Sequence, residues 1–234
     1  CKIPRWDLGK FHGVRREIGS SMKSVGEVMA IGRTFEEVIQ KGLRMIGQGM
    51  HGVVGNNQRD LPELEHALKE PTDKRIFAIA QALFKGYTVD RIHELTKIDK
   101  WFLQKVMNIV EMENRIKTEP MTAELMLAAK KKGFADVTIA GYIGKTWQEV
   151  REMRKGWGII PTYKMVDTCA AEFEAATPYY YSTYAEEDEV EVSDKKKVAV
   201  LGSGPIRIGQ GVEFDYCSVH SVWALKELGY ETII

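Results

Sequence analysis

Neither sign of charge dominates this sequence: its 234 residues carry 33 Lys and Arg against 33 Asp and Glu, a formal net charge of zero. Proteins that bind nucleic acid need a basic excess, or at least a basic face, to neutralise phosphates. The balanced charge therefore argues against nucleic acid as a partner. No stretch approaches the roughly 20 apolar residues of a membrane span, and the chain does not open with the basic and then apolar segments of a signal peptide. We expect a cytoplasmic protein without a membrane partner.

Cysteine is scarce as well. Cys1, Cys169 and Cys217 lie far apart and form no Cys-x-x-Cys pair. Zinc and redox motifs need closely spaced cysteines, and an odd number suits no disulfide framework. The five histidines show no metal-ligand spacing. We therefore predict no metal site within these residues and a reducing compartment.

The two ends of the sequence are typical of a piece of a longer polypeptide. The sequence opens at Cys1 instead of methionine and closes on ETII (231–234), a β-branched run that resembles the start of a strand. A sheet whose last strand begins at these residues would need a further segment of chain to continue it. We therefore expect a longer parent protein.

Most of the sequence has helical periodicity. Thr34 and Glu37 have the spacing of a capping box at the head of a helix that Gly47 can end. A cluster of glycines and amides at 47–57 then marks a boundary. Beyond it the pattern predicts short helices at 62–68, 72–85, 88–95, 99–116, 121–132, 135–143 and 146–155, with Thr72, Thr88 and Asp99 at starts. The sequence thus predicts an all-helical domain.

Part of this helical region nearly repeats. The segments at 85–95 and 132–142 share Lys-Gly-aromatic and an apolar residue six places after the glycine, Ile92 or Ile139. Two helices joined by a tight turn could place one helix in a DNA groove. Two packed helical hairpins explain the repeat equally well, and the neutral charge favours them.

After Pro161 the helical pattern ends. Four tyrosines fall within residues 178–184, a density that suits an extended segment lying across a surface. A platform for stacked bases is the alternative. The acidic 186–191 and basic 195–197 stretches have little to bury and read as a solvated linker.

A glycine-rich loop follows the apolar run at 198–201. Its glycines are Gly202, Gly204, Gly209 and Gly211. The dinucleotide fingerprint Gly-x-Gly-x-x-Gly is not met, because Arg207 occupies the third glycine position. The spacing alone leaves open whether the loop holds a dinucleotide, a nucleoside triphosphate or no ligand.

Five ordered motifs together resemble the middle of the large subunit of carbamoyl-phosphate synthase. They are KIPRWDL (2–8), MKSVGEVMAIGRT (22–34), IDKWFL (98–103), VDTCAAEF (166–173) and LGSGPIRIGQGVEFDY (201–216). The resemblance implies a mainly α chain, in which a helical oligomerisation domain is flanked by the end of an ATP-grasp α+β domain and the start of an α/β pre-ATP-grasp domain. The implied boundaries are 1–47 for the tail of the first synthetase half, 48–190 for the helical domain and 191–234 for the start of the second half.

The resemblance also implies an activity. The family makes carbamoyl phosphate from bicarbonate, ammonia and two ATP, for arginine or pyrimidine biosynthesis. Ammonia comes from glutamine through an amidotransferase small subunit, and ATP is used with Mg or Mn. The nucleotide and metal ligands of this family fall outside these 234 residues, so we expect no catalytic residue here and no activity from this piece alone. The family's helical domain implies self-association.

By resemblance, Glu27, Gly211 and Glu213 line a tunnel that carries carbamate between the two halves. An enclosed path protects a reactive intermediate from water. Carboxylates can accept hydrogen bonds from the carbamate amino group, while glycine leaves the bore open.

The residues by themselves permit plainer roles. Glu27 could be a surface acid or a partner of Lys23. Glu213 and Asp215 could place negative charge in the first turn of a helix, where the helix dipole favours it. The glycines could serve only a tight turn. A helical interaction module, or a helix-turn-helix nucleic-acid-binding module, fused to a nucleotide-binding domain is the alternative function.

Overall fold

The computed structural model describes residues 1–56, 61, 63–176, 178–202 and 204–234. Helices dominate this part of the chain, as the sequence predicts. They are α1 (Phe35–Met45), α2 (Leu64–Lys69), α3 (Arg75–Phe84), α4 (Val89–Thr96), α5 (Lys100–Thr118), α6 (Ala123–Lys131), α7 (Asp136–Ile143), α8 (Trp147–Gly156) and α9 (Glu213–Glu227), with a short 3-10 turn at Leu8–Lys10. The strands are β1 (Lys2–Arg5), β2 (Gly26–Met29), β3 (Thr162–Met165), β4 (Tyr180–Thr183), β5 (Lys197–Ala199) and β6 (Glu231–Ile233). None of the described helices has the length and apolar run needed to cross a membrane.

The amino-terminal residues form a β-hairpin that packs on α1. β1 and β2 are antiparallel, with Arg5 opposite Gly26, and the inward side chains Ile3 and Val28 join one buried core with residues of α1. Arg5 is buried and donates to the carbonyl oxygens of Ile46 and Gly47 at the end of α1. The hairpin therefore also satisfies carbonyls that the helix terminus leaves open.

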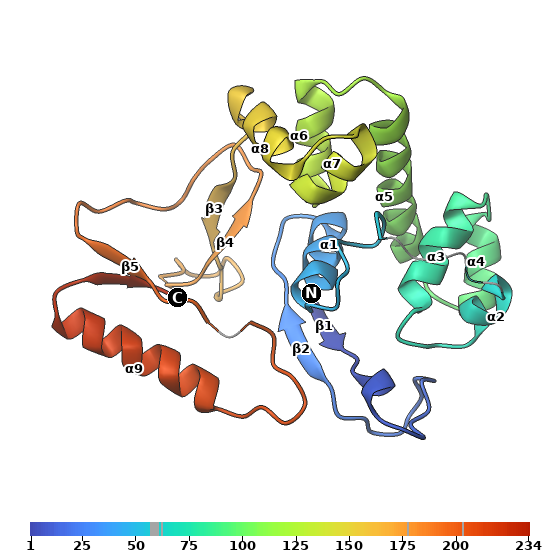
Figure 1. Cartoon of the computed structure of the whole chain (residues 1–234), viewed down its shortest axis with the longest axis horizontal. Coiled ribbons are helices and arrows are strands. Elements are labelled where there is room, and N and C mark those ends of the chain that lie inside the picture. Colours follow the sequence, from blue (N-terminus) through green and yellow to red (C-terminus); the bar gives the residue numbers. More distant parts are fainter. Residues whose placement is uncertain (57–60, 62, 177, 203) are drawn as a thin grey trace.

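The helical body is arranged around α5, its longest helix (Figure 1). α5 contacts α3 and α4 on one side and α1, α6 and α7 on the other. Its buried side chains recur at helical spacing and include Leu103, Val106, Ile109, Val110, Met112 and Ile116. This apolar stripe lets one helix join both groups of shorter helices in a common core.

Several predicted helix caps are confirmed. The side chains of Thr88 and Asp99 accept hydrogen bonds from the first-turn amides of α4 and α5. The predicted start at Thr72 is wrong, because α3 begins at Arg75 and the backbone of Thr72 pairs with that of Glu17 instead. The predicted start of α2 at Pro62 lies outside the described residues, as do Asn57 in the predicted boundary and Ser203 in the glycine loop.

The predicted capping box of α1 is only half formed. Thr34 accepts from the amide of Glu37 at 3.3 Å, as expected. The Glu37 carboxylate, however, accepts from the amide of Arg33 and pairs with Lys41, instead of returning to the amide of Thr34. A complete capping box lies at Thr146, at the head of α8.

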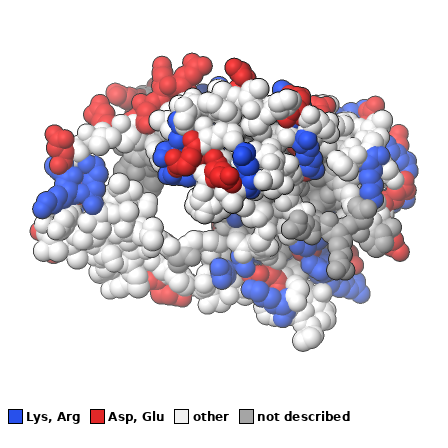
Figure 2. All heavy atoms as spheres, turned by 45° about the horizontal axis from the view of Figure 1, so that its top comes forward, with Lys and Arg blue, Asp and Glu red and all other residues white. Residues whose placement is uncertain are grey.

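Helix termini explain the near-repeat. At the end of α3 the amides of Gly86 and Tyr87 donate to the carbonyls of Leu83 and Ala82. At the end of α6 the amides of Gly133 and Phe134 bond to the α6 carbonyls three and five residues earlier. Both glycines have positive φ, which makes each Lys-Gly-aromatic triplet a Schellman stop. The repeat is thus two helical hairpins. Acidic and basic side chains are mixed over the face shown in Figure 2, which therefore presents no continuous basic surface.

The carboxyl-terminal third contains two small β units. The tyrosine segment is extended, as predicted, and its β4 pairs antiparallel with β3. Tyr184 then packs its ring against Lys130 and Arg154, which docks the segment on the helical body. β5 and β6 are parallel and joined by α9, the β-α-β order that the sequence predicts. The domain boundaries at 47 and 190 stay a prediction.

Candidate functional site

Strand β2 and the glycine loop meet although about 180 residues of chain separate them. The backbones of Glu27 and Ile206 form an antiparallel bridge, so the loop pairs with β2. β2 is therefore flanked by β1 through its hairpin register and by the loop through this bridge. Two of the motifs that predict the tunnel come together at this point.

Glu27 lies on the outer side of β2. Its neighbours Gly26 and Val28 are buried, whereas the Glu27 side chain keeps 44% of its surface exposed. Its carboxylate pairs with Lys2 of β1, with Nζ and Oε2 2.8 Å apart. The alternative partner Lys23 is wrong, since the Lys23 ammonium donates to the carbonyl of Arg15. The hairpin thus gives the predicted tunnel carboxylate a cation beside it.

The loop beyond Ile206 closes in a tight turn. The amide of Gln210 donates to the carbonyl of Arg207 at 3.1 Å, and the Gln210 side chain accepts from the amide of Arg207 at 3.0 Å. Gly209 has φ +85°, the conformation that a type II turn requires at its third residue. Gly204 also has positive φ, whereas Gly202 does not. The glycines of the loop therefore serve different purposes.

Gly211 and Glu213 lie where the loop enters α9. The amide of Gly211 donates to a carboxylate oxygen of Glu213 at 3.0 Å. Hydrogen bonds from the Glu213 amide and then from that of Gly211 lower the pKa of this carboxyl, so it is ionised at neutral pH. Glu213 is the first residue of α9, a position where the helix dipole also favours negative charge.

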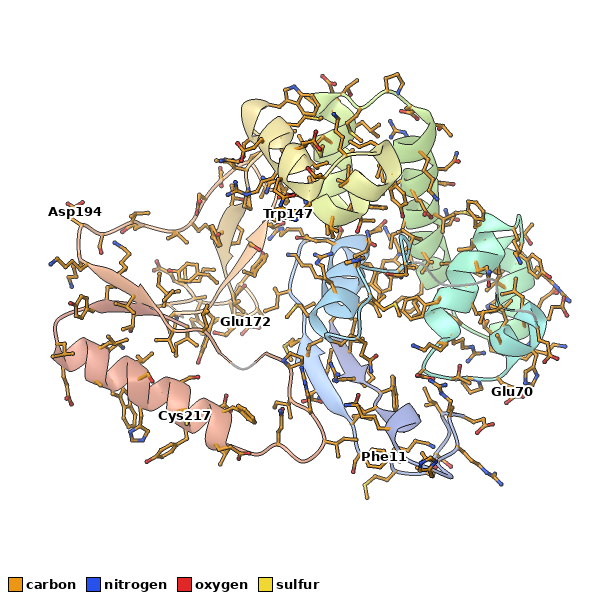
Figure 3. The ribbon with its side chains drawn as sticks, in the orientation of Figure 1. Phe11, Glu70, Trp147, Glu172, Asp194 and Cys217 are labelled. Atoms are coloured by element: carbon orange, nitrogen blue, oxygen red, sulfur yellow. The ribbon has the colours of Figure 1, made fainter. Side chains whose placement is uncertain are left out.

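The arrangement offers hydrogen-bond acceptors. Glu27 and Glu213 present carboxylates on the exposed side of β2 and at the start of α9. Among the described residues, no three His, Cys, Asp or Glu side chains are grouped as metal ligands. The three cysteines, all described, are unpaired, and Cys217 projects from α9 in Figure 3.

Comparison with known proteins identifies the family to which this chain belongs. Residues 27–158 match the family model described as "Carbamoyl-phosphate synthetase large chain, oligomerisation domain", more than half of the chain. The chain belongs to this family. Residues 194–234 match the carbamoyl phosphate synthase preATP-grasp domain.

Relatives named "Carbamoyl phosphate synthase large chain" are similar over the whole chain. The identity is 52% over 234 residues to the relative from Methanothermobacter thermautotrophicus, 51% over 235 to that from Thermoanaerobacter pseudethanolicus and 50% over 244 to that from Archaeoglobus fulgidus. All of this chain is covered in each case, but only 22%, 22% and 23% of the relatives. The chain therefore spans about a fifth of the length of these large chains.

The candidate residues fall in two different domains of the family. Glu27 lies at the start of the oligomerisation-domain match, while Gly211 and Glu213 lie in the preATP-grasp match. The bridge between Glu27 and Ile206 joins these two parts. Sequence reasoning missed Lys2 and Gly26 as members of this contact, although both stand inside the quoted motifs.

Proposed function

We propose that this chain is part of a carbamoyl-phosphate synthase large subunit, an ATP-dependent ligase that makes carbamoyl phosphate from bicarbonate, glutamine-derived ammonia and two ATP. In this proposal the 234 residues connect the two synthetase halves and line part of the passage that carries carbamate between them. The contact of β2 with the glycine loop is the observation that carries the proposal, because it joins the two motifs that supply Glu27 and Gly211.

Each candidate residue has a role that its surroundings suit. The carboxylates of Glu27 and Glu213 would accept hydrogen bonds from the amino group of carbamate. Carbamate is itself an anion, and Lys2 beside Glu27 offsets the repulsion that two carboxylates would cause. Gly211, with no side chain, would leave the bore open. The passage would exclude water and so protect the intermediate from hydrolysis.

ATP and Mg or Mn would supply phosphoryl transfer in the complete enzyme. By resemblance to the family, the nucleotide and metal ligands lie in parts of the large chain outside these 234 residues, and we derive no step through them. For the same reason we expect these 234 residues alone to be inactive. Further parts of the proposal are a glutamine amidotransferase small subunit as partner, a cytoplasmic location, and a product that serves arginine or pyrimidine biosynthesis.

Self-association through the helical body is a second element of the proposal. Large apolar side chains remain exposed on it, including Phe84, Trp101, Phe102 and Trp147. The rings of Phe35, Trp101 and Phe102 form a cluster with centroids 5.0 to 5.7 Å apart. Exposed apolar clusters of this kind are typical of protein interfaces. No observation favours the helix-turn-helix alternative, since the helix caps explain the repeat.

The test is carbamoyl phosphate formation by the complete large chain with an amidotransferase subunit, supplied with glutamine, bicarbonate and ATP with Mg. We expect product from the complete enzyme and none above the uncatalysed background from the 234 residues alone. A complete enzyme that forms no carbamoyl phosphate contradicts the proposed activity. Product from the 234 residues alone contradicts the placement of the ATP sites outside them.

A further inference from the structure

Gly26 lies where β2 meets the glycine loop. It is buried, begins β2 and pairs with Arg5 on the β1 side. A Cβ atom built on Gly26 would lie 1.8 Å from the carbonyl oxygen of Ile206, 2.8 Å from its carbonyl carbon and 3.2 Å from the Cα of Arg207. All three atoms belong to the backbone of the loop, so no side-chain rotation can relieve the clash.

Glycine is required here for contact and not for conformation. Gly26 does not have positive φ, in contrast to Gly204 and Gly209 in the loop. Alanine could therefore adopt its backbone angles without strain. Only the approach of the loop backbone forbids a side chain at position 26.

This contact determines where the candidate passage residues lie relative to one another. Glu27 follows Gly26 directly and forms the bridge to Ile206. From Ile206, the hydrogen-bonded turn at 207–210 leads to Gly211, whose amide holds the Glu213 carboxylate. A displaced loop would carry Gly211 and Glu213 away from Glu27 together.

We propose that Gly26 is a positioning residue that registers the two synthetase halves: its missing side chain lets β2 pair with the glycine loop, and this pairing aligns Glu27 with Gly211 and Glu213 along the carbamate passage. The inference rests on the proposed function. A side chain at position 26 forces the loop off β2, so the passage opens to water where the halves meet, while both sites of phosphoryl transfer stay intact.

The kinetic test compares Gly26→Ala with Gly19→Ala in the complete large chain with its amidotransferase. Gly19 is a matched control, because its added Cβ meets nothing within 4 Å and its φ is not positive. In Gly26→Ala we expect overall carbamoyl phosphate formation to fall at least about tenfold, while bicarbonate-dependent ATP hydrolysis and ATP synthesis from carbamoyl phosphate and ADP stay within about twofold. ATP consumed per product should rise, because leaked carbamate decomposes. Equal rates in the two variants, or equal losses in all three reactions, would overturn the inference.

A second measurement judges the contact without relying on a variant or on activity. In the unmodified complete chain, hydrogen exchange should show the amide of Ile206 protected relative to the exposed amides at 186–188. Exchange at Ile206 as fast as at 186–188 refutes the docking of the loop on β2, whether or not the enzyme makes carbamoyl phosphate. Conversely, protected amides in a chain that makes no carbamoyl phosphate would uphold the contact and refute only the proposed function.

Discussion

Replacing Asp136 with asparagine should destabilise the helical body through two buried cations. The side chains of Lys130 and Arg154 are 7% and 11% exposed, and both bind the Asp136 carboxylate, at 2.7 Å and 2.9 Å. Asp136 is the first residue of α7, Lys130 belongs to the last turn of α6 and Arg154 to that of α8. One carboxylate therefore links three helices.

The expected cost follows from leaving both cations buried without this anion. Breaking a buried ion pair by removing one partner costs about 3 to 5 kcal/mol. Asparagine keeps one acceptor oxygen, so we expect Asp136→Asn to lower the free energy of unfolding by about 3 kcal/mol, the lower end of that range. The control is Asp90→Asn, because Asp90 pairs with Lys100 at 2.6 Å but is 72% exposed. An exposed pair of this kind contributes far less to stability than a buried one, because water and salt screen it.

The loss of stability in Asp136→Asn should also depend on pH. Burial raises the pKa of Asp136, but Lys130 and Arg154 outweigh it and hold the pKa below 3.8. The carboxylate therefore stabilises the fold above pH 3.8, and this contribution is lost as pH falls through the folded-state pKa. The difference between wild type and Asp136→Asn should shrink accordingly in acid.

Lys130 titrates at the other end of the pH range. Burial lowers its pKa despite the attraction of Asp136, and the charges of Arg154 and Arg44 act in the same direction. The unfolded state therefore binds more protons, and stability rises with pH in the window below 10.5. In this alkaline range Asp136→Asn should regain part of the free energy of unfolding that it loses at neutral pH, because Lys130 gives up its buried charge there. Urea unfolding followed by far-UV circular dichroism measures these effects, and a cost no larger than that of Asp90→Asn at neutral pH would refute the reasoning.

Three further predictions concern the helices. Gly86→Ala should lower the free energy of unfolding by about 1 kcal/mol, because alanine is strained at the positive φ of this position. Gly133→Ala should lower it clearly more, because an added Cβ there also meets the carbonyl oxygen of Glu37 at 3.0 Å. Equal losses for the two variants in urea unfolding would contradict this. Thr146→Ala should cost about 1 kcal/mol by removing the capping box of α8, and an unchanged urea midpoint would count against that cap. The 234-residue chain should self-associate in light scattering, and Trp101→Ser should weaken this; a monomer at every concentration would refute the interface.

The helices follow from local chemistry that the sequence displays. Thr88 and Asp99 cap helices because their side chains accept from amides two or three residues ahead, whatever the rest of the chain does. The Thr72 hydroxyl also accepts from an amide two residues ahead, that of Lys74, but α3 begins only at Arg75, and the backbone of Thr72 pairs with Glu17 of a distant segment. Likewise Arg33 and Lys41 compete for the Glu37 carboxylate and leave the capping box of α1 incomplete.

The residues of the candidate site are a prediction from resemblance, and the contacts that the structure gives them could not be predicted from the sequence. The motifs identify Glu27, Gly211 and Glu213 by resemblance, and the acid in the first turn of α9 also follows from the helix dipole. The bridge between Glu27 and Ile206, in contrast, depends on how the chain folds back over a long separation. For the same reason no local pattern shows Gly26 to be a contact glycine or Lys2 to be the partner of Glu27.

The passage itself is tested most directly at Gly211, in the complete enzyme. A Cβ atom there would lie 2.6 Å from a carboxylate oxygen of Glu213, the far end of a flexible side chain that can move away, and φ is not positive. Leucine at this position therefore fits the backbone, and the exposed Glu213 carboxylate can exchange its bond to the Gly211 amide for water.

The decisive measurement is the set of three rates in Gly211→Leu: bicarbonate-dependent ATP hydrolysis, ATP synthesis from carbamoyl phosphate and ADP, and overall carbamoyl phosphate formation. A blocked passage predicts that the overall rate falls at least about tenfold while both partial reactions stay within about twofold of wild type. An overall rate that is unchanged, or that falls only in step with ATP synthesis, would contradict a carbamate passage at Gly211.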